Sequence, residues 1–202
     1  MRVLDVGCGL GIERALQFLN QECSYIGIDI SSECIHYNKL KIHELSVSDV
    51  DYICDDANHF SRLKGELFDV IIMSGTLHHL DFSFSLPSLK SLLSSNGRVL
   101  MWEPMATNPL LRLFRSLTPA LRSEDEHPLT FDDFKHIDQF FPRSNYELHS
   151  ITVLSLVPLL MLGIPLCAVN PLINLFGRLD MLLGKIVFVR RFAWIVIIDL
   201  RL

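Results

Sequence analysis

The sequence has no block of lysine or arginine residues, and this absence excludes one class of partner. Its 202 residues include 18 lysines and arginines against 23 acids, which is a formal net charge of −5. Because bulk binding of nucleic acid depends on neutralising phosphates with cations, we expect no nucleic-acid partner. Internal repeats and low-complexity tracts are also missing. The length therefore predicts one domain, residues 1–202, with a sizeable core.

Cysteine is present, but in no pattern that would hold a disulfide framework or a metal. There are five cysteines, an odd number, and no two of them form a Cys-x-x-Cys pair. His78 and His79 are adjacent, so they lie on different sides of the chain, and no acid or cysteine stands at ligand spacing from them. No signal peptide precedes the first apolar strand. These absences predict reduced thiols, no metal site and a cytoplasmic protein.

Charge is missing from a long stretch near the C-terminus. No formally charged residue lies between Glu147 and Arg178, and residues 151–169 are long enough for a membrane span. Two prolines interrupt this stretch, and a second apolar segment, residues 179–189, has cations around it. This arrangement is typical of a helical hairpin in a membrane interface, so we expect peripheral membrane contact through 151–189. A packed lid, a homodimer surface and a true span are the alternatives.

The most informative pattern that is present joins an apolar strand to three alternating glycines, within residues 3–11. Asp5 precedes Gly7, Gly9 and Gly11, and helical periodicity begins directly after them. Glycines at such a turn let the backbone approach a ligand without a Cβ clash. A dinucleotide-binding turn requires Gly-x-Gly-x-x-Gly, and neither register fits here, because isoleucine or arginine occupies the third position.

Four further apolar segments follow, each with polar residues at its end, and helix-start signals stand between them. Alternation of strands and helices implies a mainly parallel sheet with helices on both faces, whose ligands lie beyond the carboxyl ends of the strands. Helix starts are indicated by Ser31, by Ser85 with Pro87, by Asn108 and by Thr130 with Asp133. The strand-end residues are Asp29, Asp55, Asp56, Ser74, His78, His79 and Glu103.

In this order and spacing, the motifs resemble those of the Rossmann-like, class I S-adenosylmethionine-dependent methyltransferases. The resemblance covers residues 3–104, including an Asn-Gly turn at 96–97 before the fifth strand. It implies a doubly wound, mainly parallel seven-stranded α/β sheet. Its last two strands would lie near 146–148 and 193–200, the last antiparallel beside 99–103. The apolar helical insertion, about 151–189, would then lie between them.

The resemblance implies S-adenosylmethionine as the cofactor and a set of residues that contact it. Asp29 would accept hydrogen bonds from the ribose hydroxyls, and Asp56 would face the adenine amino group, with the adjacent Asp55 as the alternative. A purely structural strand-to-helix turn is the competing interpretation of the glycines, and Cys8 fits a small packed hydrophobe. The expected cofactor-binding residues are Asp5, Gly7, Cys8, Gly9, Gly11, Asp29, Ile30, Asp56, Ala57 and Ser74.

The function implied is methyl transfer to a small-molecule or lipid-linked acceptor, with oxygen as the favoured atom. The apolar segment favours a lipophilic acceptor, and the Asn/Asp-Pro-Pro-aromatic tetrad of amino-group methyltransferases is missing after the fourth strand. His79 and Glu103 are the candidate catalytic residues, since both border the expected pocket, although approximation alone can also drive methyl transfer. The alternative function is a catalytically silent, membrane-associated partner subunit. Relatives usually carry a helix or two before the first strand, which here starts almost at Met1; a shortened member and a longer chain both fit.

Overall fold

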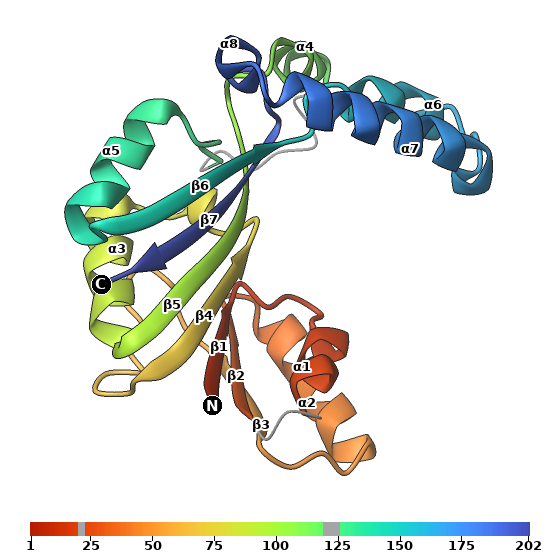
Figure 1. Cartoon of the computed structure of the whole chain (residues 1–202). Coiled ribbons are helices and arrows are strands. Elements are labelled where there is room, and N and C mark those ends of the chain that lie inside the picture. The colour runs from red at the N-terminus through yellow and green to blue at the C-terminus, as the bar shows by residue number, and fades with distance from the viewer. Residues whose placement is uncertain (20–22, 119–125) are drawn as a thin grey trace.

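A seven-stranded sheet runs through the centre of the computed structural model, which describes residues 1–19, 23–118 and 126–202 (Figure 1). The strand order is β3-β2-β1-β4-β5-β7-β6, and every pairing is parallel except those of β7 with β5 and β6. The predicted doubly wound sheet with an antiparallel last strand is confirmed. The strands are β1 (Arg2–Val6), β2 (Ser24–Asp29), β3 (Val50–Cys54), β4 (Phe68–Ser74), β5 (Leu93–Pro104), β6 (Arg143–His149) and β7 (Ile195–Arg201).

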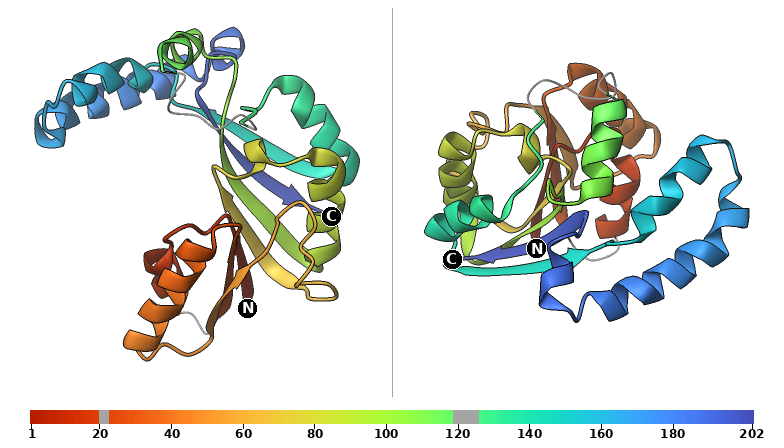
Figure 2. Two further views of the ribbon diagram at one scale, coloured as in Figure 1. Left: turned by 180° about the vertical axis from the view of Figure 1, so that it is seen from behind. Right: turned by 90° about the horizontal axis from the view of Figure 1, so that it is seen from above.

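Helices cover both faces of the sheet, as Figures 1 and 2 show. On one face, α1 (Ile12–Leu19) and α2 (Ser32–Glu44) pack against β1 to β3 around a cluster that includes Tyr25 and Tyr52. On the other face, α3 (Phe82–Leu92) and α5 (Phe131–Phe140) cover the larger cluster, which includes Phe68 and Ile137. Two parallel layers of apolar side chains therefore hold the strand ends in fixed positions.

Three of the predicted helix starts are confirmed by their caps. Ser31 Oγ accepts from Cys34 N at 3.2 Å before α2, and Asn108 Oδ1 caps α4 (Pro109–Leu117). Thr130 and Asp133 form the expected capping box before α5. In each case a side-chain oxygen satisfies backbone N–H groups that the first helical turn leaves unpaired.

Two predicted boundaries are wrong. Helix α3 begins at Phe82 and not near Pro87, because Asp81 Oδ1 accepts from Ser83 N at 2.8 Å and so caps the helix five residues earlier. The Asn-Gly pair at 96–97 lies inside β5, at a shift in its register with β4. A Cβ on Gly97 would come within 2.8 Å of Phe68 O, so glycine is needed there for close strand packing and not for a turn.

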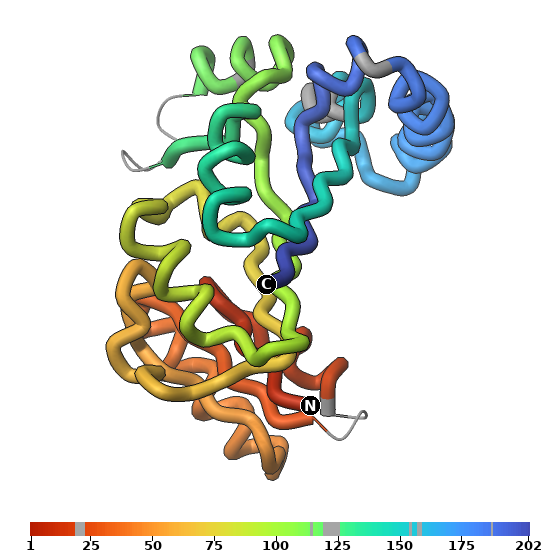
Figure 3. Tube along the Cα trace, turned by 60° about the vertical axis from the view of Figure 1, so that its left-hand side comes forward, coloured from red at the N-terminus to blue at the C-terminus, as the bar shows by residue number. Residues whose placement is uncertain are grey.

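The apolar insertion between β6 and β7 forms a helical hairpin that projects from the sheet (Figures 1 and 3). It comprises the short helices η3 (Val153–Leu156) and α6 (Val157–Met161), the long helix α7 (Leu166–Leu183) and α8 (Val187–Arg190). The hairpin turns between α6 and α7, where Gly163 has φ +79° and Pro165 precedes the first residue of α7. The predicted apolar run at 151–169 is therefore divided by the turn, and its last residues begin the second arm.

Helix α7 is the one described helix that is long and apolar enough, by length and composition, to cross a membrane. Its 18 residues have a mean hydropathy of 1.3, and only 6% of them are buried. Helices packed in the core of a protein are mostly buried, so α7 differs from α3 and α5. Most of its leucines are exposed, and Val169 is its one buried side chain among the described residues.

Candidate active site

A hollow of about 440 Å³ lies where the carboxyl ends of β1, β2, β3 and β4 meet. This is the edge at which an open parallel sheet binds its ligands. Of the residues singled out from the sequence, the structure brings these to its walls: Gly7, Asp29, Ile30, Asp55, Asp56, Ala57, Ser74 and His79.

The three glycines of the turn after β1 serve different purposes. A Cβ on Gly7 would overlap the side chain of Thr76, and a Cβ on Gly11 would overlap the carbonyl of Cys8. Gly9 differs, because its Cβ position meets no atom within 4 Å, although its φ of +51° favours glycine. The protein's own packing therefore accounts for two of the glycines, whereas Gly9 faces open space that a ligand can occupy.

Asp29, at the end of β2, holds the glycine turn against the start of α2. Its Oδ2 accepts from Gly9 N at 2.8 Å, and its Oδ1 accepts from Ser31 N at 2.9 Å. A carboxylate oxygen can accept more than one hydrogen bond. Asp29 can therefore fix the turn and still receive hydroxyl groups of a ligand in the hollow.

Asn38 is a site residue that the sequence analysis missed. It is fully buried on α2, and its Nδ2 donates to Gly9 O at 2.7 Å. Gly9 is thus held from both sides, through its N–H by Asp29 and through its carbonyl by Asn38. One signal could have revealed it: Asn38 follows Ile35 by three residues and precedes Ile42 by four, which places a polar side chain on the apolar face of the helix.

Asp5 and Cys8 lie behind the turn and do not line the hollow. Asp5 is fully buried, forms an ion pair with Arg14 Nη1 at 2.6 Å and accepts a short hydrogen bond from Tyr25 OH. Burial raises the pKa of the Asp5 carboxyl, while Tyr25 and Arg14 oppose that rise. The Cys8 thiol is also buried, and burial raises its pKa. Both residues support the turn from the protein side.

Asp55 and Asp56 both line the hollow, but their oxygens are used differently. Asp55 Oδ1 accepts from Asp56 N and its Oδ2 accepts from Arg62 N, so both oxygens bind backbone. Asp56 uses only Oδ1, which accepts from the backbone and side chain of Asn58. Its Oδ2 accepts no hydrogen bond from the residues that the structure describes. Within this pair of acids, Asp56 Oδ2 is therefore the oxygen whose acceptor capacity is wholly open to a ligand.

Glu103 lies beneath the loop after β4 and not in the wall of the hollow. This fully buried carboxylate accepts from Thr76 N at 3.0 Å and Leu77 N at 2.8 Å through Oε1. Its Oε2 lies 2.7 Å from His78 Nδ1. The structure thus differs from the expectation that Glu103 faces the pocket, because three groups of the loop enclose it.

His79 is the histidine that reaches the hollow. His78 is buried, and its Nε2 lies 4.0 Å from Glu126 Oε1, which also pairs with Arg115 at 2.7 Å. The ring centroids of His78 and His79 are 4.1 Å apart. Glu103 therefore positions His79 indirectly, by fixing the loop and the ring beside it. In the described ranges no group of three or more His, Cys, Asp or Glu residues could hold a metal ion.

The strand order, the antiparallel β7 and a glycine turn facing a carboxylate together define the class I methyltransferase fold. A sequence profile described as a methyltransferase domain matches residues 1–140. The chain therefore belongs to this methyltransferase domain family, whose cofactor is S-adenosylmethionine. No protein among the curated ones matches the chain significantly.

Solved structures share the fold at low sequence identity. The YcgJ protein of Bacillus subtilis is 23% identical with a TM-score of 0.59, over 73% of this chain and 63% of that one. A structure described for the conversion of a disulfide bond into a thioacetal group during echinomycin biosynthesis is 19% identical (TM-score 0.56, 73% and 65% covered). A protein from Pyrococcus horikoshii is 17% identical (TM-score 0.54, 74% and 76%). The chain thus spans just under two thirds of the first two structures.

Proposed function

We propose that this chain transfers the methyl group of S-adenosylmethionine to a small or lipid-linked acceptor, with oxygen as the acceptor atom. The observation that carries the proposal is the open space over Gly9 beside the Asp29 carboxylate. The site fits the cofactor in kind, because it combines the approachable backbone at Gly9 with the two acidic acceptors and the exposed apolar side chain of Ile30 in the hollow.

The predicted cofactor-binding residues have different parts in this proposal. Asp29 would accept the ribose hydroxyls and Asp56 Oδ2 the adenine amino group, while Ile30 and Ala57 give the base an apolar wall. Asp5, Cys8 and Gly11 would act from behind by fixing the turn. S-adenosylmethionine, when bound, supplies an electrophilic methyl group on its sulfonium. Such a transfer requires chiefly that the acceptor be held in line with that group.

His79 is the proposed general base for an acceptor hydroxyl. It lies in the wall of the hollow, and imidazole is the side chain best suited to accept a proton near neutral pH. Glu103 is proposed as a positioning residue, since its contacts are to the loop and to His78 and not to the hollow.

The hairpin supports a lipophilic acceptor and a peripheral membrane contact. Along α7, Leu172, Leu175, Leu179 and Leu182 form an exposed apolar seam with alternating spacings of three and four residues, each 38% to 61% exposed. Asn170, Asn174 and Arg178 form a separate exposed polar stripe. From 150 to 194 there are four cationic side chains and one acid, although the chain is negative overall. Such a helix suits an anionic membrane surface.

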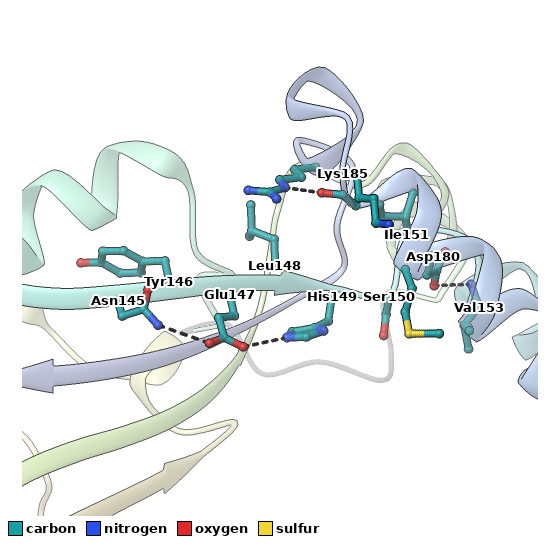
Figure 4. A pocket seen from close by; sticks show the side chains of 14 residues that line it. Asn145, Tyr146, Glu147, Leu148, His149, Ser150, Ile151, Val153, Asp180 and Lys185 are labelled. Carbon is teal, nitrogen blue, oxygen red and sulfur yellow. Dashed lines mark hydrogen bonds and ion pairs between the residues drawn. The ribbon is translucent and has the colours of Figure 1, made fainter.

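The polar stripe favours a helix lying in the membrane plane. Asn170 is near the tip of the hairpin and Arg178 is near its base, so insertion tip-first would bury part of the stripe in hydrocarbon. The single acid, Asp180, accepts from Thr152 N at 2.6 Å. It also accepts from Val153 N at 3.4 Å (Figure 4), so it caps η3 and ties α7 to it. The hairpin therefore has a fixed base.

A catalytically silent partner subunit is the second candidate function. The exposed leucine seam favours it, because an apolar stripe of this spacing can also pack against a helix of a partner or of a second copy. In that case the chain would form a homodimer or a complex through α7.

Binding and methyl release separate the two candidates. Calorimetry with S-adenosylmethionine comes first, and release of radiolabelled methyl to extracted lipids and to water-soluble metabolites comes second. We expect the wild type to bind the cofactor and to place label in the lipid fraction. His79→Ala should lose the labelled product and still bind the cofactor. Label in the soluble fraction alone would contradict the lipophilic acceptor. Binding without any labelled product would favour the silent subunit.

A further inference from the structure

A second hollow, of about 1060 Å³, opens at the base of the hairpin along the same edge of the sheet as the cofactor hollow. Residues from five elements or their ends meet there: the segment after β5, α4, the start of α5, the end of β6, and α8 with the residues after it. The hollow of Figure 4, of about 590 Å³, is a neighbour that shares Leu148 and Arg190 with it but is otherwise lined mainly by β6 and α7.

Arginines and phenylalanines dominate its walls, and no acid contributes to them. The lining includes Arg112, Arg190, Arg191, Phe131, Phe188 and Phe192. Within the part of the chain that the structure describes, none of the three arginines has an acidic partner, a state they share with Arg62, Arg143 and Arg178. Arg190 Nε donates to the carbonyl of Gly184. Three cations therefore converge without neutralisation, in a protein of net charge −5.

Thr107 adds an unpaired hydroxyl at the same place. It lines the hollow, and its buried Oγ1 has no hydrogen-bond partner among the described residues. Buried hydroxyl groups in folded proteins are almost always paired. A ligand in the hollow is one source of the missing partner.

We propose that this hollow binds the phosphate group of an amphiphile, with the phosphate on the three arginines and the apolar chain against the phenylalanines. A phosphate monoester carries about −1.5 to −2 charges at neutral pH and three terminal oxygens. That matches three guanidinium groups better than a carboxylate, which has one charge and two oxygens. Phe188, which lines the hollow, is 65% exposed, so it offers an apolar surface to a chain bound there.

This inference deepens the proposed function by giving the lipophilic acceptor, or the lipid that anchors the protein, a phosphate. It rests on the proposed function only where it identifies the bound amphiphile as the methyl acceptor or the anchoring lipid. Binding to the hollow is measured without S-adenosylmethionine and without turnover, so the two can fail separately.

The test is calorimetry of the whole chain with octyl phosphate below its micelle concentration, beside octanol, octanoate and inorganic phosphate. We expect octyl phosphate to bind most tightly. Each of Arg112→Gln, Arg190→Gln and Arg191→Gln should weaken it by about tenfold, as expected for a lost charge-assisted hydrogen bond. Arg178→Gln, on the same hairpin but outside the hollow, is the matched control and should bind normally. Urea denaturation of each variant reports that it is folded, independently of any cofactor.

Several results would overturn the inference. If octanol binds as tightly as octyl phosphate, the phosphate group is not recognised. If inorganic phosphate binds as tightly, the apolar chain is not recognised. If octanoate binds as tightly, the hollow does not distinguish a phosphate from a carboxylate. Vesicles of phosphatidylcholine with and without phosphatidic acid then identify the source. If octyl phosphate binds and the arginine variants also lose binding to vesicles that contain phosphatidic acid, the ligand is a bilayer lipid. If the variants bind these vesicles as the wild type does, the ligand is a free amphiphile. Vesicle binding without octyl phosphate binding would show a charged surface and contradict a pocket.

Discussion

Gly9 tests the cofactor site at the scale of one residue, because its Cβ position is open although its backbone is left-handed. Gly9→Val should abolish S-adenosylmethionine binding by filling the space that the cofactor requires. Gly65→Val is the matched control, since Gly65 also has positive φ and nothing within 4 Å of its Cβ. Strain should destabilise both variants by about 1–3 kcal/mol, but only Gly9→Val should lose binding in calorimetry. Retained binding in Gly9→Val would refute the site.

Asp29 supplies the second test, because its carboxylate is the acidic group held beside the open glycine. Asp29→Ala should weaken S-adenosylmethionine binding by about 1.5–3 kcal/mol, the range for a hydrogen bond to a charged group. Asp132→Ala, an exposed acid at the start of α5, is the control and should leave the affinity unchanged. Unchanged affinity in Asp29→Ala would show that the ribose hydroxyls bind elsewhere.

Asp5 predicts a pH dependence of stability with a definite sign. Burial raises its pKa in the folded state above the ordinary value of 3.8, so the folded chain keeps this proton at a pH where the unfolded chain has lost it. Its contribution to stability is therefore full below about pH 3.8 and is lost as pH rises through the folded pKa. Urea denaturation at several pH values should show this fall in the wild type and not in Asp5→Asn.

Asp69 gives the opposite sign and so serves as a control. Its pKa is lowered by the N–H of Arg2, which means that its contribution appears as pH rises above the lowered value. Asp69→Asn should thus remove a gain in stability that the wild type shows as pH rises. Asp5→Asn should remove a loss in stability that the wild type shows as pH rises. The same slope in both variants would contradict the assignment for Asp5.

At this scale the sequence predicted the residues that line the hollow at the strand ends better than those that hold them. Gly7, Asp29 and Asp56 follow strands directly, so local pattern was sufficient. Arg14, Tyr25 and Asn38 act through contacts across 9 to 29 residues, which no local pattern contains. Glu103 shows the same limit: its position at a strand end was predictable, but its burial under the loop depends on how that loop folds.

At the scale of elements, Asn108 joins α4 to the hairpin. Its Oδ1 accepts from Leu110 N, and its Nδ2 donates to Phe192 O at 2.6 Å. Asn108→Ala removes the cap and leaves a partly buried carbonyl unpaired, so unfolding free energy should fall by about 2–4 kcal/mol. Asn108→Ser keeps a capping hydroxyl and should recover only part. Urea denaturation measures both, and a loss below about 0.5 kcal/mol in Asn108→Ala would contradict this coupling.

The hairpin shows why element boundaries are harder to predict than elements. Hydropathy indicated two apolar segments, and the helices are there, but the turn falls at Gly163 inside the first segment. The left-handed glycine and the following proline decide the turn, whereas the hydropathy pattern is continuous across it. In α3, likewise, the carboxylate of Asp81 decides the start, although Pro87 is the more conspicuous signal.

At the scale of the whole molecule, the chain combines a buried apolar core with an exposed apolar hairpin. The sheet and its helices bury continuous apolar layers, while α7 exposes its leucines on a hairpin that leaves the body of the molecule (Figure 3). Both strands that flank the hairpin, β6 and β7, pair in one sheet over seven residues. A single membrane crossing between them is therefore incompatible with this fold.

This topology yields the last prediction, on intact vesicles of anionic lipid. If α7 lies in the membrane plane, protease added from outside should reach both Glu147, before the hairpin, and Arg190, after it, because both are exposed. The protein should resist washing with salt and dissolve in mild detergent. As a matched pair, Leu175→Ser with Leu182→Ser should weaken vesicle binding, whereas Asn170→Ser and Asn174→Ser on the polar stripe should not. Cleavage at Glu147 with protection of Arg190 would mean that the chain crosses the bilayer. A protein that never leaves solution would instead make the leucine seam a surface for another helix, and the acceptor would then be sought among soluble molecules.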